Sequence, residues 1–200
     1  MKTKAAAALF ASYKTSRAIP CVLPFRRDFM IQNTLDAGVR RIDYHPVVAL
    51  DDRVIRTDTI SIERDDGRYV IDFVDARPQD DRGTHGLVQL GFELGCAGIL
   101  ALTAADMVRE PLLSAARQVW HYSDVSLSAG DRAQVLEALE DEGPVPLRAL
   151  QGLVATRREP AHVVYALACE GSVAIDLHGG LDGRTIVRGA TFGLSRRCAT

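Results

Sequence analysis

Lysine is almost absent from this 200-residue chain. Of its 24 basic residues, 21 are arginine, and the remainder are Lys2, Lys4 and Lys14. No lysine follows Lys14, which excludes a catalytic lysine from the rest of the chain. GC-rich coding would explain the arginine bias without any function, but the chemical consequence is the same for either cause.

Paired cysteines are absent as well. Zinc-ribbon and redox motifs place two cysteines three positions apart, whereas Cys21, Cys96, Cys169 and Cys198 are far from one another. We therefore expect reduced thiols and a cytoplasmic protein. The glycines form neither a dinucleotide-binding motif nor a phosphate loop with its lysine, and the histidines lack metal-ligand spacing.

Long apolar runs are also missing. No stretch approaches the roughly 18–20 apolar residues of a membrane span, so we expect no membrane partner. The first residues are basic and then alanine-rich, as in a signal peptide, but the apolar part is short and Lys14 and Arg17 soon follow it. The sequence therefore predicts a loose basic N-terminal arm over residues 1–23.

The formal net charge of −2 conceals a segregation of charge. Residues 1–28 contain six basic and one acidic residue, residues 29–143 contain 11 and 21, and residues 144–200 contain seven and four. The middle of the chain is thus acidic, and both ends are basic. Because nucleic-acid backbones attract positive charge, the ends are where DNA contact is expected first.

The stretch from residue 24 to 120 predicts one α/β domain. Its predicted elements are a helix over 25–35, a strand over 39–50, a hairpin over 53–75, a helix over 84–94, a buried strand over 97–102 and a helix over 104–119. Pro46 favours an edge or a bulge in the first strand. Asp65, Asp66 and Gly67 form a strong turn signal inside the hairpin.

The pattern changes after a predicted linker over residues 121–130. Three short helical segments follow, opened near Ser128, Leu147 and Glu159, and then two strands separated by a glycine-rich turn. Three helices followed by a two-stranded ribbon are typical of a winged helix-turn-helix. Residues 131–200 are therefore predicted to form a small winged-helix-like domain.

Two carboxylates on the hairpin are the candidate catalytic residues. Asp58 lies on the first strand and Asp72 on the second, where an antiparallel pair can bring the two side by side. Paired carboxylates could hold Mg²⁺, a cation that prefers oxygen ligands. The metal would polarise a phosphate and activate a water for hydrolysis, although solvated strand faces carry such pairs routinely.

The element order together with Asp58 and Asp72 resembles the PD-(D/E)XK nuclease core, and more specifically the TnsA-type endonuclease subunit of heteromeric transposases. The resemblance covers roughly residues 24–120 and rests on order and spacing more than on identity. The matching stretches are Arg26 to Met30, Val39 to Pro46, Thr57 to Thr59, Asp66-Gly67 and Ile71 to Val74, with Pro78 after them. The resemblance implies DNA cleavage with Mg²⁺ held by Asp58 and Asp72.

This chain departs from the family pattern at two of four catalytic positions. Arg26 stands where the family has a helix glutamate, and Val74 stands where it has a lysine. Arg26 would repel a metal cation, and Val74 cannot donate to a phosphate, so Arg56 or Arg77 would have to supply that charge. Arginine stabilises charge but is a poor general base, because it stays protonated. We therefore expect eroded or lost cleavage.

Four arginines of the predicted winged-helix-like domain are the candidate DNA-binding residues. Arg157 and Arg158 precede its third helix, and Arg184 and Arg188 lie on its ribbon. In a winged helix these positions face phosphates, although arginines on an ordinary solvated surface would look the same.

Three functions thus stay open from the sequence. The first is a DNA-interacting relative of the transposase subunit with an eroded metal site. The second is a non-catalytic winged-helix module that binds DNA or a transposase-type protein partner. The third is an interaction subunit without DNA contact, which the acidic middle of the chain favours because it repels phosphate.

Overall fold

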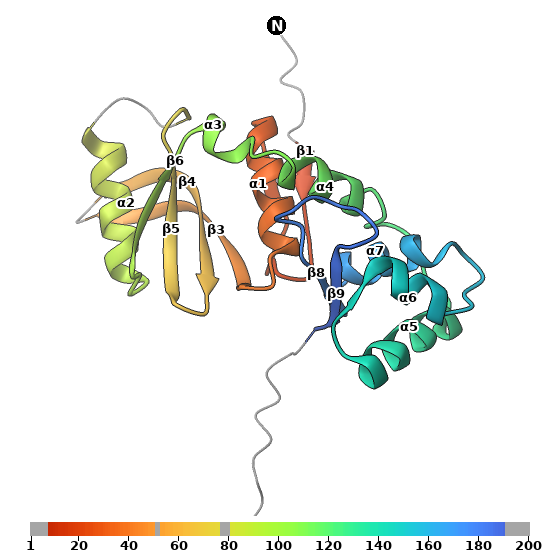
Figure 1. The fold of residues 1–200 in the computed structure, drawn as a ribbon. Coiled ribbons are helices and arrows are strands. Elements are labelled where there is room, and N and C mark those ends of the chain that lie inside the picture. The colour runs from red at the N-terminus through yellow and green to blue at the C-terminus, as the bar shows by residue number, and fades with distance from the viewer. Residues whose placement is uncertain (1–7, 51–52, 77–80, 191–200) are drawn as a thin grey trace, which may run out of the picture. The chain divides into compact units, whose positions relative to one another are not determined.

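The computed structural model describes residues 8–50, 53–76 and 81–190. The chain divides into two compact units, residues 1–117 and 118–200 (Figure 1). This boundary lies a few residues before the predicted one, so the predicted linker over 121–130 falls inside the second unit. No helix among the described residues is long and apolar enough to cross a membrane.

The first unit contains a four-stranded mixed sheet in the order β3-β4-β5-β6. The strands are β3 (Val39–Leu50), β4 (Arg53–Arg64), β5 (Gly67–Phe73) and β6 (Gly98–Leu102). β3, β4 and β5 are antiparallel neighbours, and β6 runs parallel to β5. The predicted hairpin is confirmed, and its turn lies at Asp65 and Asp66. Gly67 follows with a backbone φ of 142°, which residues other than glycine rarely adopt.

Two helices cover the two faces of this sheet (Figure 1). On one face, α1 (Pro24–Leu35) packs Phe29 against Phe73, with ring centroids 5.6 Å apart. On the other face, Leu87 and Leu90 of α2 (Asp81–Glu93) belong to a buried cluster with Val70 of β5. The expected order of helix, three strands, helix and strand is therefore present.

The prediction of a loose arm is wrong for residues 8–23. β1 (Ala8–Phe10) and β2 (Ile19–Cys21) form an antiparallel pair in which Phe10 and Ile19 are buried. Lys14, between these strands, is also buried, and its Nζ donates to the carbonyl oxygens of Asn33 at 3.2 Å and Asp36 at 2.5 Å. The carbonyls at a helix C-terminus lack partners and attract positive charge, so this lysine fixes the segment to the end of α1.

Two further predictions about the first unit need correction. β6 is not buried: Ile99, Leu100 and Ala101 are exposed, because β6 is an edge strand rather than a central one. The predicted helix over 104–119 is two helices, α3 (Ala104–Met107) and α4 (Leu112–Trp120). Pro111 lies between them, and proline restricts the residue before it to non-helical conformations. Thr103 caps α3, since its side chain accepts a hydrogen bond from the amide of Asp106.

The second unit combines three helices with a small antiparallel sheet. Its elements are α5 (Ala129–Glu142), β7 (Val145–Pro146), α6 (Leu147–Leu153), α7 (Pro160–Cys169), β8 (Val173–Ile175) and β9 (Ile186–Gly189). The sheet order is β7-β9-β8. The helices and the last two strands were predicted, whereas β7 was not, because two residues ending in proline carry no strand pattern.

Candidate functional site

The candidate carboxylate Asp58 lies in a bulge of β4. His45 of β3 pairs with Thr59, and Val47 pairs with Arg56, so β4 has one more residue than β3 between these two pairs. Pro46, which has no amide hydrogen to donate, lies opposite this extra residue. Asp58 has a φ of 43° and is the described non-glycine residue with a positive φ. Aspartate tolerates this left-handed conformation better than most residues.

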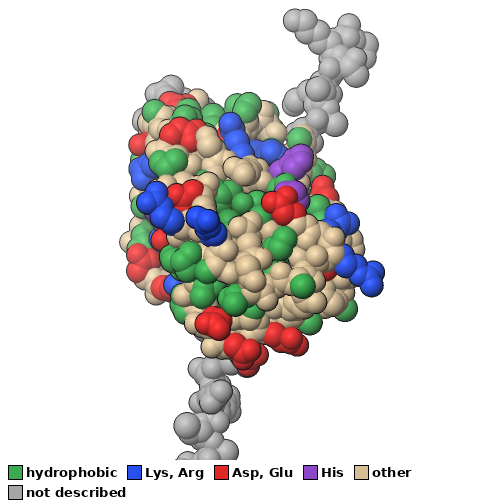
Figure 2. Space-filling model, turned by 45° about the vertical axis from the view of Figure 1, so that its right-hand side comes forward, with side chains coloured by type: hydrophobic (Ala, Val, Ile, Leu, Met, Phe, Trp, Pro, Cys, Tyr) green, Lys and Arg blue, Asp and Glu red, His purple; other side chains and the backbone are tan. Residues whose placement is uncertain are grey.

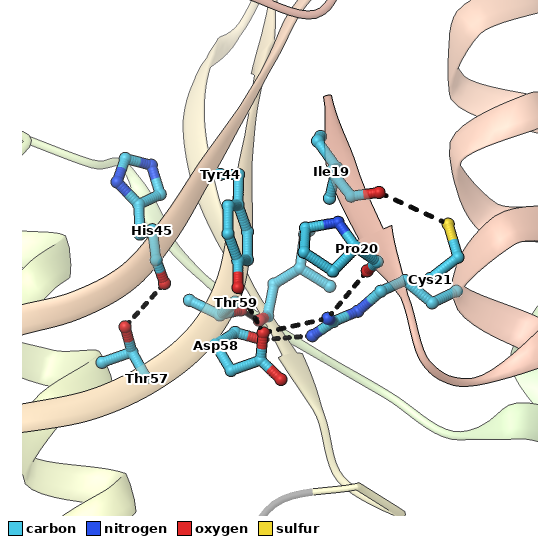
Figure 3. Close-up of polar contacts among 10 residues, drawn as sticks. Ile19, Pro20, Cys21, Tyr44, His45, Thr57, Asp58 and Thr59 are labelled. Carbon is cyan, nitrogen blue, oxygen red and sulfur yellow. Dashed lines mark hydrogen bonds and ion pairs between the residues drawn. The ribbon is translucent and has the colours of Figure 1, made fainter. Parts of the chain in front are cut away.

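Arg26 of α1 binds both the carboxylate and the backbone carbonyl of Asp58. Figure 3 labels Asp58 and the neighbouring Tyr44 and Pro20. Nη1 lies 3.2 Å from Oδ1 of Asp58, and Nη2 donates to the Asp58 carbonyl oxygen. Nη1 also donates to the carbonyl of Pro20 at 3.4 Å, which ties β2 to this point. The Arg26 side chain is 4% exposed and that of Asp58 is 32% exposed. The ion pair is therefore largely removed from water.

Tyr44 of β3 completes this cluster. Its hydroxyl donates to Oδ1 of Asp58 at 2.6 Å. Burial raises the pKa of Tyr44 to about 12, and the bond to Asp58 adds to that effect, so the phenol keeps its proton. Arg17 donates to the Tyr44 carbonyl and lies 5.4 Å from the centre of its ring. Oδ1 of Asp58 thus receives hydrogen bonds from both Arg26 and Tyr44.

Asp72 belongs to the other face of the sheet. The register pairs Ile60 with Ile71, so continuing the ladder places Thr59 opposite Asp72 and Asp58 opposite Phe73. Phe73 faces α1, where its ring lies 5.1 Å from the guanidinium carbon of Arg26. Since successive strand residues point to opposite faces, the side chain of Asp72 points away from α1, and it is 5% exposed.

The residues around Asp58 do not fit a Mg²⁺ ion. The cation already beside its carboxylate is Arg26, and the neighbouring side chain from β5 is the phenyl ring of Phe73. Mg²⁺ requires several oxygen ligands in near-octahedral geometry. Within the described ranges, no three His, Cys, Asp or Glu residues form a group that could hold a metal. The pairing of Asp58 with Asp72 as metal ligands stays a prediction that the register does not favour.

Of the two arginines that could replace the lysine expected from the resemblance, Arg56 and Arg77, the structure describes only Arg56. Arg77 lies outside the described residues, as does Pro78. Arg56 is exposed on β4, two residues from Asp58, and its charge acts on Tyr44 by lowering its pKa. Arg56 is therefore near the cluster, although it makes no ion pair in the described part of the chain.

A second ion pair fixes α1 from another side. Asp28, two residues after Arg26, accepts two hydrogen bonds from Arg117: Nε donates to Oδ1 at 2.9 Å and Nη2 donates to Oδ2 at 2.7 Å. Two parallel hydrogen bonds of this kind orient both side chains. Asp28 therefore holds α1 against α4 and is not available as the acidic helix residue of a nuclease site.

In the second unit, the candidate DNA-binding arginines lie on the surface. Arg157 and Arg158 are exposed in the loop before α7, Arg184 is exposed in the loop before β9, and Arg188 is exposed on β9. Buried Asp131 accepts a hydrogen bond from the Arg157 amide at 2.8 Å, which lowers the pKa of Asp131 and fixes the loop. On the face drawn in Figure 2, basic side chains stand apart from one another, with acidic ones among them.

Helix α7 has no exposed face with which to read bases. All residues from Ala161 to Cys169 are buried except His162, and none of its side chains carries an acidic or basic group other than that histidine. The segment before α5 covers part of it: Tyr122 stacks on His162 at 4.5 Å, and Cys169 Sγ lies 3.4 Å from the Val119 carbonyl oxygen. Tyr122 therefore packs against α7.

Sequence reasoning overlooked Tyr44 and underestimated Arg26. An arginine two residues before an aspartate on a predicted helix gives no sign of which one turns inward, and Tyr44 reads as an ordinary strand residue. One signal was available in the sequence. Arg26 stands where the resembled family has an acidic residue, and an arginine that is buried there requires an acidic partner. No protein-family model and no curated protein matches this chain.

Proposed function

We propose that this protein binds DNA without cleaving it, as a relative of the TnsA-type endonuclease subunit of heteromeric transposases whose metal site has become an ion pair. The observation that carries the proposal is the buried Arg26–Asp58 ion pair, and the proposal is that its guanidinium stands where the family would hold the metal. The order α1-β3-β4-β5-α2-β6, with β6 parallel to β5, supports the nuclease-like ancestry.

The chemistry of arginine explains why this exchange abolishes cleavage. A guanidinium supplies a fixed positive charge that neutralises the carboxylate, but it carries no water whose pKa it could lower. Mg²⁺ would have to displace Arg26 from a nearly water-free position, and removing one member of a buried pair costs about 3–5 kcal/mol. Val74 adds no donor for a scissile phosphate. Asp58 accordingly serves to hold α1 on the sheet.

The DNA contact is proposed to run through phosphates rather than bases. Arg157, Arg158, Arg184 and Arg188 are exposed, while the helix that they flank is buried. Phosphate contacts fix position but carry no sequence information. We therefore expect binding that depends strongly on salt and little on sequence, and a transposase-type partner would have to supply target choice and cleavage.

The test of cleavage is a plasmid-nicking assay with Mg²⁺ or Mn²⁺. The wild type and Asp58→Ala should be equally inactive, since neither forms a metal site. Nicking by the wild type that disappears in Asp58→Ala would contradict the proposal and restore Asp58 as a metal ligand. Nicking that survives in Asp58→Ala would point to a contaminating nuclease, which a second purification of both proteins would remove.

The test of binding is fluorescence anisotropy with a short DNA duplex over a range of salt concentrations. Replacing Arg157 and Arg158 together by alanine should weaken binding for every duplex sequence and reduce the salt slope by about 2. Arg40→Ala is the matched control, because Arg40 is an exposed arginine of the first unit that pairs with Asp65. An equal loss in the control would show general charge attraction instead of a site.

A non-catalytic winged-helix-like module that binds a protein is the second candidate function. Its support is the order α5-β7-α6-α7-β8-β9, three helices with a three-stranded sheet whose last two strands form the ribbon. The buried α7 favours a protein partner over base-specific DNA binding. Anisotropy that does not change with any duplex at low salt would favour this second function over the first.

A further inference from the structure

The two edges of the sheet in the first unit differ in their protection. The β3 edge carries Arg40, Arg41 and Asp43, is interrupted by Pro46, and is bridged by the segment at Thr15, which pairs with Ile42. Charges, proline and covering segments are the devices by which proteins keep an edge strand from pairing with another chain. The β3 edge is therefore blocked.

Within the residues that the structure describes, the β6 edge carries none of these devices. Its sequence, Gly98-Ile99-Leu100-Ala101-Leu102, has no charge and no proline, and its register with β5 is continuous. Ile99 is 39% exposed and Leu100 is 36% exposed, on opposite faces of the strand. An unprotected apolar edge is a template for strand addition.

The backbone groups that β6 leaves open are arranged symmetrically about Leu100. The Leu102 carbonyl accepts from the Val74 amide at 3.0 Å, so the backbone of Leu102 faces β5. Backbone groups alternate in direction along a strand, so Gly98 and Leu100 face β5 as well, whereas Ile99 and Ala101 point their amides and carbonyls outward. The open groups therefore lie one residue before and one residue after Leu100.

We propose that this protein forms a homodimer in which β6 pairs antiparallel with β6 of a second copy, around a two-fold axis at Leu100. In this register Ile99 forms a hydrogen-bonded pair with Ala101 of the second copy, and Ala101 pairs with Ile99. Every outward backbone group then has a partner. The large Ile99 lies opposite the small Ala101, Leu100 meets its own copy, and no charge meets another charge. The two four-stranded sheets become one continuous sheet.

This self-complementarity is the reason for choosing a second copy as the occupant. A two-fold interface requires one surface to fit itself. Around Leu100 of β6 the outward backbone groups are placed symmetrically, and each larger side chain meets a smaller one, Ile99 opposite Ala101 and Leu102 opposite Gly98. An unrelated partner strand would need no such symmetry. The inference concerns a different face from the Arg26–Asp58 cluster and does not depend on DNA binding.

The first experiment measures the mass of the full chain in solution by light scattering coupled to size exclusion. The wild type should be a dimer, and Leu100→Lys should be a monomer because two lysines would meet at the axis. Phe92→Lys is the control: Phe92 is an 84% exposed apolar residue of helix α2 and not of the β6 strand. A monomeric wild type, or a dimer that Phe92→Lys dissociates and Leu100→Lys does not, would overturn the proposal.

The second experiment tests the register without disturbing the fold. Directly opposite residues of a non-hydrogen-bonded antiparallel pair have Cα atoms about 4.5 Å apart, which a disulfide can bridge. Leu100→Cys should therefore give a covalent dimer under mild oxidation, well above the wild-type background from native cysteines. Ile99→Cys should not, because Ile99 faces Ala101 of the second copy. Cross-linking of Ile99→Cys alone would refute the axis at Leu100.

Discussion

The two units of this chain bury different chemistry. In the first unit, Lys14, Arg26, Asp28 and Asp72 are all buried charged groups. In the second unit, the described buried charge is Asp131, and the centre is the apolar helix α7. Buried charge is expensive and persists where partners or function retain it. The contrast shows that the first unit holds several charged groups in its interior, whereas the second is held together by apolar packing.

The largest effect is expected where that apolar packing is interrupted. Leu167 of α7 is fully buried, so Leu167→Ala should leave a cavity and cost about 2–5 kcal/mol of unfolding free energy. The loss should be confined to the second unit. Trp120, the single tryptophan of the chain, lies in that unit and is 9% exposed, so its fluorescence during urea unfolding reports the change.

Removing the central cation of the first unit should have the next largest effect. Arg26→Met leaves the Asp58 carboxylate without its ion partner, and we expect a loss of about 3 kcal/mol, the lower end for a broken buried pair because Asp58 is one-third exposed. Hydrogen exchange of β4 and β5 peptides should increase. Asp58→Asn added to Arg26→Met should recover part of the loss, and a further loss would contradict the ion-pair interpretation.

The buried lysine should make stability depend on pH. Burial lowers the pKa of Lys14 to about 8 from 10.5, although Asp36 opposes the shift. The unfolded chain then binds more protons than the folded chain between these values, so the contribution of Lys14 to stability rises with pH from about 8 to 10.5, by about 3 kcal/mol. Below pH 8 this gain is absent.

Other groups titrate over the same range, so the measurement is a difference. Burial raises the pKa of the Cys169 thiol from 9.0 to about 12, so its contribution to folding stability falls as the pH rises above 9.0. Urea unfolding of the wild type and of Lys14→Met at a series of pH values isolates the lysine. Equal pH dependence in both proteins would show that Lys14 stays charged when buried.

The smallest effect is expected at the outer ion pair. Arg117 is 56% exposed, whereas Asp28 is 12% exposed. Solvent weakens such a pair, so Arg117→Gln should cost about 1 kcal/mol or less, because glutamine can still donate one hydrogen bond to Asp28. A thermal shift as large as that of Arg26→Met would remove the distinction that we draw between the two pairs.

The sequence predicted those elements whose signals are local. The hairpin over 53–75 follows from alternation and from Gly67, and the helices of the second unit follow from their caps and apolar spacing. Features that depend on a distant partner were not predicted. The exposure of β6 depends on its place at the edge of the sheet, and the ordered structure of the N-terminal segment depends on Lys14 reaching the end of α1. The break between α3 and α4 at Pro111 did have a local signal, but the apolar spacing across it favoured one helix.

The sequence predicts that Asp58 and Asp72 hold a metal together, and that role stays a prediction. In the structure Asp58 is bound by Arg26, and the register of the hairpin decides which β5 side chain faces it. Asp72 and Phe73 are neighbours in β5, so their side chains point to opposite faces of the sheet. A register shift of one residue would exchange which of them faces Asp58. The bulge opposite Pro46 shifts the pairing of β3 with β4, whereas the pairing of β4 with β5 runs without a shift from the turn at Asp65 and Asp66. Counting residues from that turn would have placed Phe73, and not Asp72, opposite Asp58.

The position of Lys14 also gives the chain a built-in reporter of its own opening. A protease that cuts only after lysine has no target between residues 15 and 200. Cleavage after Lys14 requires the segment between β1 and β2 to leave the end of α1, since the side chain is 7% exposed there. The rate of cleavage after Lys14, followed separately from cleavage after Lys2 and Lys4, therefore measures how often the β1–β2 hairpin detaches while the rest stays folded.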